Sequence, residues 1–207
     1  MRTKNNYYLQ MQQAKQQFLT YDQETLIRKL NIKADSQYLY PILFSAQYRM
    51  SRTTGDTECL KSGIWQDANE FEEVMTLLDL ICDSREDRHV SGQWKSMRDF
   101  GLMFHQTLLE ERKDPWACYF QENVEAFRAA CEALGGKAVP SGDIAYRIEV
   151  FDGLPVMLQL WFGDDEFPPN LRLLWDENAL MYLRYETMYY ARGLLLEQIK
   201  EKMDTSC

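Results

Sequence analysis

Three segments of the chain place apolar residues every three or four positions, with polar residues between them. The segments are residues 71–81, 114–134 and 185–201, and each pattern predicts an amphipathic helix that buries one face. Asp114-Pro115 marks the start of the second helix, because proline at the first helical position loses no hydrogen bond. The predicted buried positions are Phe71, Val74, Met75, Leu78 and Ile81 in the first helix, Trp116, Phe120, Val124, Phe127, Cys131 and Leu134 in the second, and Met188, Ala191, Leu195 and Ile199 in the third.

Capping residues mark further helix starts. Asp67, followed by an acid three positions later, is an acidic variant of the capping box, and it predicts that the helix over 71–81 opens directly after Asp67. Ser96 with Asp99 predicts another capped helical stretch, running through Leu109.

Residues 144–161 alternate apolar and polar side chains on both sides of a Phe-Asp-Gly turn, which predicts a β-hairpin. A two-residue loop at Asp152-Gly153 would pair Arg147 with Leu158, a poor match. A three-residue loop with a left-handed Gly153 forms a bulge and shifts the register by one residue. We prefer this second register, because it gives one coherent apolar face, with Ile144, Tyr146 and Ile148 opposite Leu160, Leu158 and Val156.

Other strands are predicted on both sides of the central helices. Residues 38–65 contain β-rich runs separated by turn signals and predict two or three antiparallel strands. Pro41 cannot donate to a strand ladder, so its strand is expected to lie at an edge or to be bulged there. Residues 171–175 alternate and predict one more strand.

The order of these elements shows no regular alternation of strand and helix. It predicts an α+β fold with a mainly antiparallel sheet packed with several helices in a single domain. We expect this domain to span residues 1–203, with residues 1–21 as an N-terminal helical extension and residues 204–207 as a frayed tail.

Composition and charge narrow the classes of function. The 207 residues carry 23 basic and 32 acidic side chains, a formal net charge of −9, and no basic stripe offsets it. This charge disfavours binding to nucleic acid or to an anionic membrane. No apolar run is long enough to span a membrane, and the polar N-terminal segment lacks the apolar core of a secretory signal, so we expect a cytoplasmic protein.

The five cysteines are scattered, odd in number and free of any C-x-x-C spacing. This pattern argues against a disulfide framework and against a zinc ribbon, and favours reduced structural thiols. The residues are Cys59, Cys82, Cys118, Cys131 and Cys207.

The main candidate site is the stretch "FGDDEFPPN", residues 162–170. Asp164, Asp165 and Glu166 could ligate a divalent cation, since hard cations prefer oxygen ligands. Neighbouring residues of an extended loop point to opposite sides, however, so three consecutive acids seldom converge on one ion. A rigid acidic turn with a projecting Phe167 is a better anchor for a basic partner.

Two further surfaces are candidates for ligand or partner binding. The polar face of the predicted hairpin collects Arg147 and Trp161, although the favoured explanation is a solvent-exposed face with cross-strand ion pairs, or a face covered by a helix of complementary charge. The loop "HVSGQWKS" contributes Trp94. His89 and His105 are the only histidines, and neither lies at ligand spacing from a cysteine or an acid. Motifs for nucleotide binding, zinc proteolysis and serine hydrolysis are absent from the sequence.

The chain from about residue 22 resembles a prokaryotic family described as domain of unknown function 3786. The motifs that carry the resemblance are Gly92-Gln93-Trp94, Gly135-Gly136, Gly142-Asp143, the strand Pro155 to Trp161, the acidic stretch Asp164 to Pro168, Leu174 to Asp176, and Tyr182-Leu183 with Glu186. The resemblance implies a bacterial protein, typical of anaerobes. Some relatives carry an added cysteine-rich segment of iron–sulfur type, which this sequence lacks, so we assign no cluster and transfer no catalytic residue.

These features favour a cytoplasmic binding or regulatory module that holds a protein partner or a small ligand at an acidic corner of a sheet. The alternative is an enzyme or divalent-metal-binding domain that uses Asp164, Asp165 and Glu166, with Asp143 or Asp176 brought near by the sheet. The sequence favours the module over the enzyme, and identifies neither a cofactor nor an oligomeric state.

Overall fold

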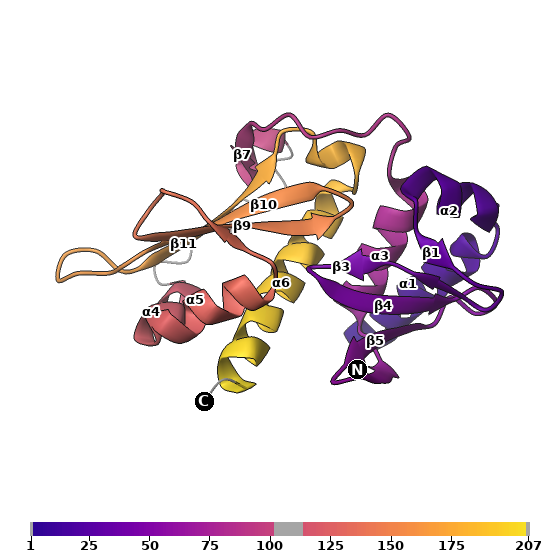
Figure 1. Ribbon diagram of the computed structural model, residues 1–207, viewed down its shortest axis with the longest axis horizontal. Helices are drawn as coiled ribbons and strands as arrows, with labels where there is room; N and C mark the ends of the chain where they lie inside the picture. Colours follow the sequence, from indigo (N-terminus) through magenta and orange to yellow (C-terminus); the bar gives the residue numbers. More distant parts are fainter. Residues whose placement is uncertain (1, 102–113, 206–207) are drawn as a thin grey trace. The chain divides into compact units, whose positions relative to one another are not determined.

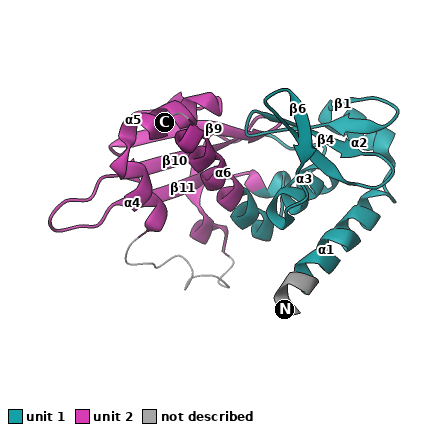
Figure 2. Cartoon of the chain, turned by 90° about the horizontal axis from the view of Figure 1, so that it is seen from below, with its two compact units in different colours: residues 1–89, 180–191 teal, residues 90–179, 192–207 magenta. Residues whose placement is uncertain are grey.

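The computed structural model describes residues 2–101 and 114–205. The chain divides into two compact units, which are described separately below (Figure 2). The first unit contains residues 1–89 and 180–191, and the second contains residues 90–179 and 192–207.

Both units combine helices with antiparallel strands, which confirms the predicted α+β class. The strands form two sheets, each within one unit. The single domain over residues 1–203 stays a prediction. Leu109 and His105, in the helical stretch predicted after Ser96, lie outside the described residues. None of the helices in the described part of the chain is both long enough and apolar enough to cross a membrane.

The first unit packs helices against a sheet of short strands. The strand order is β1-β2-β4-β5-β6, and β3 pairs with β4. Pro41 separates β2 from β3, which both pair with β4. It has no N–H to donate to this ladder, but its carbonyl accepts the N–H of Tyr48 at 2.9 Å. The helices are α1 (Arg2–Phe18), α2 (Gln23–Leu30), α3 (Phe71–Asp83) and the first part of α6 (Tyr185–Thr205), and the strands are β1 (Lys33–Ala34), β2 (Tyr38–Tyr40), β3 (Ile42–Leu43), β4 (Ala46–Ser51), β5 (Thr57–Lys61) and β6 (Ile64–Asp67).

The predicted start of α3 at Asp67 is wrong. Asp67 is the last residue of β6, where it pairs with Glu58 of β5, so the strand ladder takes the residue that the capping pattern assigned to the helix. Glu70 is the N-cap and makes no capping hydrogen bond with its side chain. The predicted buried face is correct for Val74, Leu78 and Ile81, whereas Phe71 and Met75 are only half-buried.

A buried carboxylate in the first unit holds the start of α6. Asp79 on α3 is only 7% exposed, and its Oδ2 accepts a hydrogen bond of 2.7 Å from the backbone N–H of Arg184. Its Oδ1 lies 3.3 Å from Nε of Arg184, which also pairs with Asp83. Burial, and then the neighbouring Asp83, raise the pKa of Asp79 from 3.8 to about 6.

This raised pKa predicts a pH-dependent contribution to stability. The folded state takes up a proton at Asp79 more readily than the unfolded state, so this stabilisation is present at low pH and is lost as the pH rises through about 6. The free energy of unfolding of Asp79→Asn, relative to that of the wild type, should therefore be higher at pH 7.5 than at pH 4.5, by no more than about 3 kcal/mol. Urea unfolding of both proteins at the two pH values measures this difference. The same difference at both pH values would contradict the prediction.

The second unit is a five-stranded antiparallel sheet with the order β7-β11-β10-β9-β8. Helices α4, α5 and α6 lie along one side of it (Figure 1). A 3₁₀ turn at Met97–Phe100 follows β7 and begins with the predicted capping box of Ser96 and Asp99. The elements are β7 (Trp94–Ser96), α4 (Pro115–Glu122), α5 (Val124–Ala133), β8 (Lys137–Ala138), β9 (Ile144–Phe151), β10 (Leu154–Trp161) and β11 (Asn170–Asp176), with the second part of α6.

The preferred register of the β9–β10 hairpin is confirmed, because Tyr146 pairs with Leu158. The turn itself differs from the prediction. Phe151 pairs with Leu154, so the loop has two residues, and the register shifts one pair later, between Leu154 and Pro155. Asp152 and Gly153 both have positive φ, 47° and 80°, as a tight hairpin turn requires.

The helix predicted over 114–134 is two helices. Its start is as predicted, because the Asp114 carboxylate accepts the N–H of Trp116 at 2.9 Å. The break falls at Asn123, whose backbone leaves the helical conformation and whose side chain accepts the N–H of Ala126 at the start of α5. An asparagine side chain competes for backbone groups in this way, and it ends α4 without disturbing the apolar spacing.

Candidate functional site

The acidic stretch forms the tip of the β10–β11 hairpin, between Trp161 and Asn170, and projects beyond the end of the sheet (Figure 1). At this tip Asp164 folds the chain back on itself. Its Oδ1 accepts the backbone N–H groups of Glu166 at 2.9 Å and Phe167 at 2.7 Å, and its own N–H donates to the carbonyl of Phe167 at 2.9 Å. The hydrogen bonds from Phe167 and then Glu166 lower the pKa of Asp164 below 3.8. We call Asp164–Phe167 the acidic corner.

The base of the corner is tied to two other elements of the second unit. The N–H of Gly163 donates to Oε1 of Gln121 on α4 at 2.9 Å, and the N–H of Phe162 donates to Oδ2 of Asp143 at 2.7 Å. A Cβ on Gly163 would lie 2.6 Å from Cδ of Pro169, so the two arms of the tip touch directly behind the turn. The corner is therefore held from both sides.

All four residues of the corner are exposed, and Phe167 presents the largest apolar surface. Its exposed fraction of 67% is the highest of any large hydrophobic side chain among the described residues. Asp164, Asp165 and Glu166 are exposed around it. The corner thus presents three carboxylates and one aromatic ring on a fixed backbone.

The corner does not have the form of a cation site. Asp164 directs one oxygen to two backbone donors of its own turn. Over residues 2–101 and 114–205, no group of three or more histidine, cysteine, aspartate or glutamate side chains is placed to hold a metal ion. Asp143 does lie beside the hairpin, as the metal alternative expected, but its Oδ2 accepts the N–H of Phe162. Asp176 lies at the opposite end of β11, so it cannot join the corner.

The remaining candidate residues lie apart on the second sheet. Trp161 is next to the corner, and the guanidinium of Arg172 lies 5.1 Å from the centroid of its ring. Arg147 is exposed in the middle of β9, opposite Met157. Trp94 pairs with Asp176 at the far end of the sheet, so the structure does not bring it to the corner.

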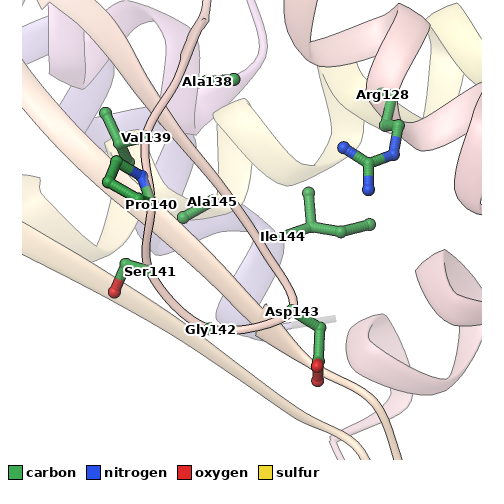
Figure 3. A pocket seen from close by; sticks show the side chains of 9 residues that line it. All are labelled: Arg128, Ala138, Val139, Pro140, Ser141, Gly142, Asp143, Ile144 and Ala145. Atoms are coloured by element: carbon green, nitrogen blue, oxygen red, sulfur yellow. The ribbon is translucent and has the colours of Figure 1, made fainter.

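A hollow that the sequence did not reveal lies between α5 and the 138–145 segment. Its volume is about 400 Å³, and Figure 3 shows the guanidinium of Arg128 directed toward Ile144 within it. Gly142 lets the segment approach the sheet, since its Cβ would lie 3.0 Å from the carbonyl oxygen of Leu160. A guanidinium beside apolar side chains can bind a carboxylate or phosphate group. The glycine-containing turn was the only sequence signal, because the rest of the hollow depends on tertiary packing.

The buried Asp176 is the second feature that the sequence left unexplained. Its carboxylate accepts the backbone N–H groups of Ser91 and Gly92, which lie 85 and 84 residues away in the sequence. It also accepts the N–H of Asn178 at 2.9 Å, as expected for a residue that caps the following turn. This cluster connects the Gly92-Gln93-Trp94 turn with the Leu174–Asp176 motif.

Comparison with known proteins gives a family and no closer relative. No curated protein and no solved structure matches the chain. The family model described as "Domain of unknown function (DUF3786)" matches residues 22–198, which include the acidic corner, Asp176 and both units' sheets. The chain belongs to this family.

Proposed function

We propose that the protein is a binding module that holds a protein partner at its acidic corner. The observation that carries this proposal is Phe167, 67% exposed on a turn whose backbone is fixed by Asp164. A residue whose backbone is already fixed loses less conformational entropy when a partner covers it, and aromatic residues supply much of the binding energy in protein interfaces.

The charge of the corner indicates the chemistry of the partner. Asp164, Asp165 and Glu166 provide three exposed carboxylates directly before Phe167 in the chain, so a complementary surface carries lysine or arginine beside an apolar recess. Exposed charges of this kind steer association and exclude acidic partners more than they add affinity.

In this proposal the module acts in the cytoplasm of a bacterium. The described cysteines support this compartment, because Cys59, Cys82, Cys118 and Cys131 form no disulfide with one another, as is usual under reducing conditions.

The proposal predicts that the corner determines which proteins the module captures. Phe167→Ala combined with Glu166→Lys should reduce the captured partner about tenfold or more, because it removes the apolar anchor and reverses one charge. Affinity purification from extracts of the native cells, with quantitative mass spectrometry, measures the effect.

A matched control is Ile64→Ala with Glu197→Lys. Ile64 is 65% exposed and Glu197 lies on the exposed side of α6, so the control removes a similar apolar area and reverses one charge elsewhere. It should capture the same proteins as the wild type. Equal recovery of all proteins by the corner variant would show that the corner is not the interface.

A further inference from the structure

One wall of the hollow between α5 and the 138–145 segment is fixed by hydrogen bonds to β10. The N–H of Asp143 donates to the carbonyl of Leu160 at 3.1 Å. The hydroxyl of Ser141 accepts Nε2 of Gln159 at 2.6 Å. Both bonds lie within the second unit and are present with the hollow empty of any ligand, as is usual for small-molecule sites, which are largely formed in advance.

The lining of the hollow is mostly apolar, with one basic side chain. Among the described residues that line it, Arg128 on α5 is the only cation, and its guanidinium is directed toward Ile144 (Figure 3). The volume of about 400 Å³ and an apolar lining with few polar groups are typical of sites for small molecules. The apolar residues of the lining are Ala138, Val139, Pro140, Ile144 and Ala145.

No close ion pair neutralises Arg128 within the described part of the chain. Its Nε lies 3.8 Å from Oε1 of Glu125, which is beyond hydrogen-bonding distance, and the Glu125 side chain is 89% exposed. The hydroxyl of Tyr146 also interacts with Arg128, and it donates to Oε1 of Glu132 at 3.1 Å. A guanidinium has five N–H donors in a planar fork, so Arg128 can still pair with both oxygens of a carboxylate.

The two neighbouring acids indicate the charge of the ligand. Glu125 lies three residues before Arg128 and Glu132 lies four residues after it, so both flank the guanidinium on the same side of α5. A phosphate monoester with two negative charges would be repelled by these two carboxylates more strongly than a ligand with one negative charge. The hollow therefore favours a carboxylate over a phosphate.

We propose that the hollow binds a small monocarboxylate with an apolar body. Arg128 pairs with the carboxylate of the ligand, and Val139 and Ile144 contact its apolar body. This site is separate from the acidic corner, and the inference does not depend on the proposed function.

Titration calorimetry of the full chain with 4-methylpentanoate tests this site. The carboxylate should bind with a dissociation constant of about 1 mM or tighter. Two compounds with the same apolar body should each bind about tenfold more weakly or less: 4-methylpentanamide, which has no charge, and isopentyl phosphate, which has a larger one. In NMR spectra, the methyl resonances of Val139 and Ile144 should shift on binding, and that of Ile64 in the other unit should not.

Two substitutions on α5 should change the affinity in opposite directions. Arg128→Gln should weaken the binding of 4-methylpentanoate about tenfold or more, because it removes the cation. Glu125→Gln should tighten the binding about twofold or more, because it removes a competing carboxylate, and a loss of folding could not produce this gain. Arg147→Gln, at an exposed arginine of β9 outside the lining, is the control and should leave the affinity unchanged.

Four results would each overturn the inference. The first is no binding of 4-methylpentanoate, and the second is equal binding of its amide. Tighter binding of isopentyl phosphate would show that the hollow takes a phosphate instead. An affinity that Arg128→Gln leaves unchanged would place the carboxylate elsewhere. None of these results bears on the proposed function, which the capture experiment at the acidic corner tests separately.

Discussion

Asp176→Asn is expected to destabilise the protein by about 3–5 kcal/mol. The Asp176 side chain is fully buried and accepts hydrogen bonds from the N–H groups of Ser91, Gly92 and Asn178 and from the hydroxyl of Ser91. Asparagine keeps the size but replaces one accepting oxygen with an N–H₂ group, which would face the donors of the 91–92 turn. Those donors would be left buried without an acceptor. The midpoint of urea unfolding measures the loss.

The dependence of this loss on pH follows from the pKa of Asp176. Burial raises the pKa, but the hydrogen bonds, of which the first is from Ser91, outweigh burial, and the folded pKa lies below 3.8. A carboxylate with a lowered pKa stabilises the fold above its unfolded pKa, and this contribution is lost as the pH falls through the folded value. The deficit of Asp176→Asn should therefore be largest near neutral pH and shrink below about pH 4.

Asp165→Asn provides the matched control. It makes the same chemical change at an exposed residue of the corner, so it should alter stability by no more than about 0.5 kcal/mol. An unfolding midpoint of Asp176→Asn equal to that of this control would show that the buried cluster does not hold the 91–92 turn in place.

The β9–β10 hairpin and the position of the corner could be predicted because both depend on neighbouring residues. Alternation fixed which side chains of β9 and β10 share a face, although the turn is the two-residue loop at Asp152-Gly153 and not the predicted three-residue loop. The prolines after Phe167 indicated where the ladder stops. Each signal lies within a few residues of the structure that it predicts.

The features that the sequence did not reveal depend on residues far apart in the chain. In the sequence, Asp176 resembles a local helix cap, and only the structure shows that it accepts the N–H of Ser91. In the same way, Asp143 resembles a turn residue, and only the structure shows that it accepts the N–H of Phe162. The break at Asn123 is local, but its side chain competes only weakly with helix formation, so the apolar spacing on both sides concealed it. The division of the strands between two sheets also depends on tertiary packing, which the spacing of apolar residues along the chain does not determine.

Gly136→Ala is expected to destabilise the protein by about 3 kcal/mol, because the close approach at this position is to backbone. A Cβ on Gly136 would lie 2.6 Å from the carbonyl oxygen of Cys131 and 3.2 Å from Cγ1 of Ile148, and both neighbours are fully buried. The N–H of Gly136 donates to the same oxygen at 2.9 Å, so the chain cannot move away without losing the hydrogen bond that closes α5.

A comparison with Gly63→Ala separates this contact from backbone conformation, with urea unfolding as the measurement. Gly63 has a φ of +79° and nothing within 4 Å of its Cβ position, so alanine there meets only conformational strain, about 1 kcal/mol. Gly136→Ala should lose clearly more stability than Gly63→Ala. Equal losses of stability in the two variants would mean that the end of α5 shifts to accommodate a methyl group at little cost. The Gly135-Gly136 motif would then be required for its turn conformation and not for the contact between α5 and β9.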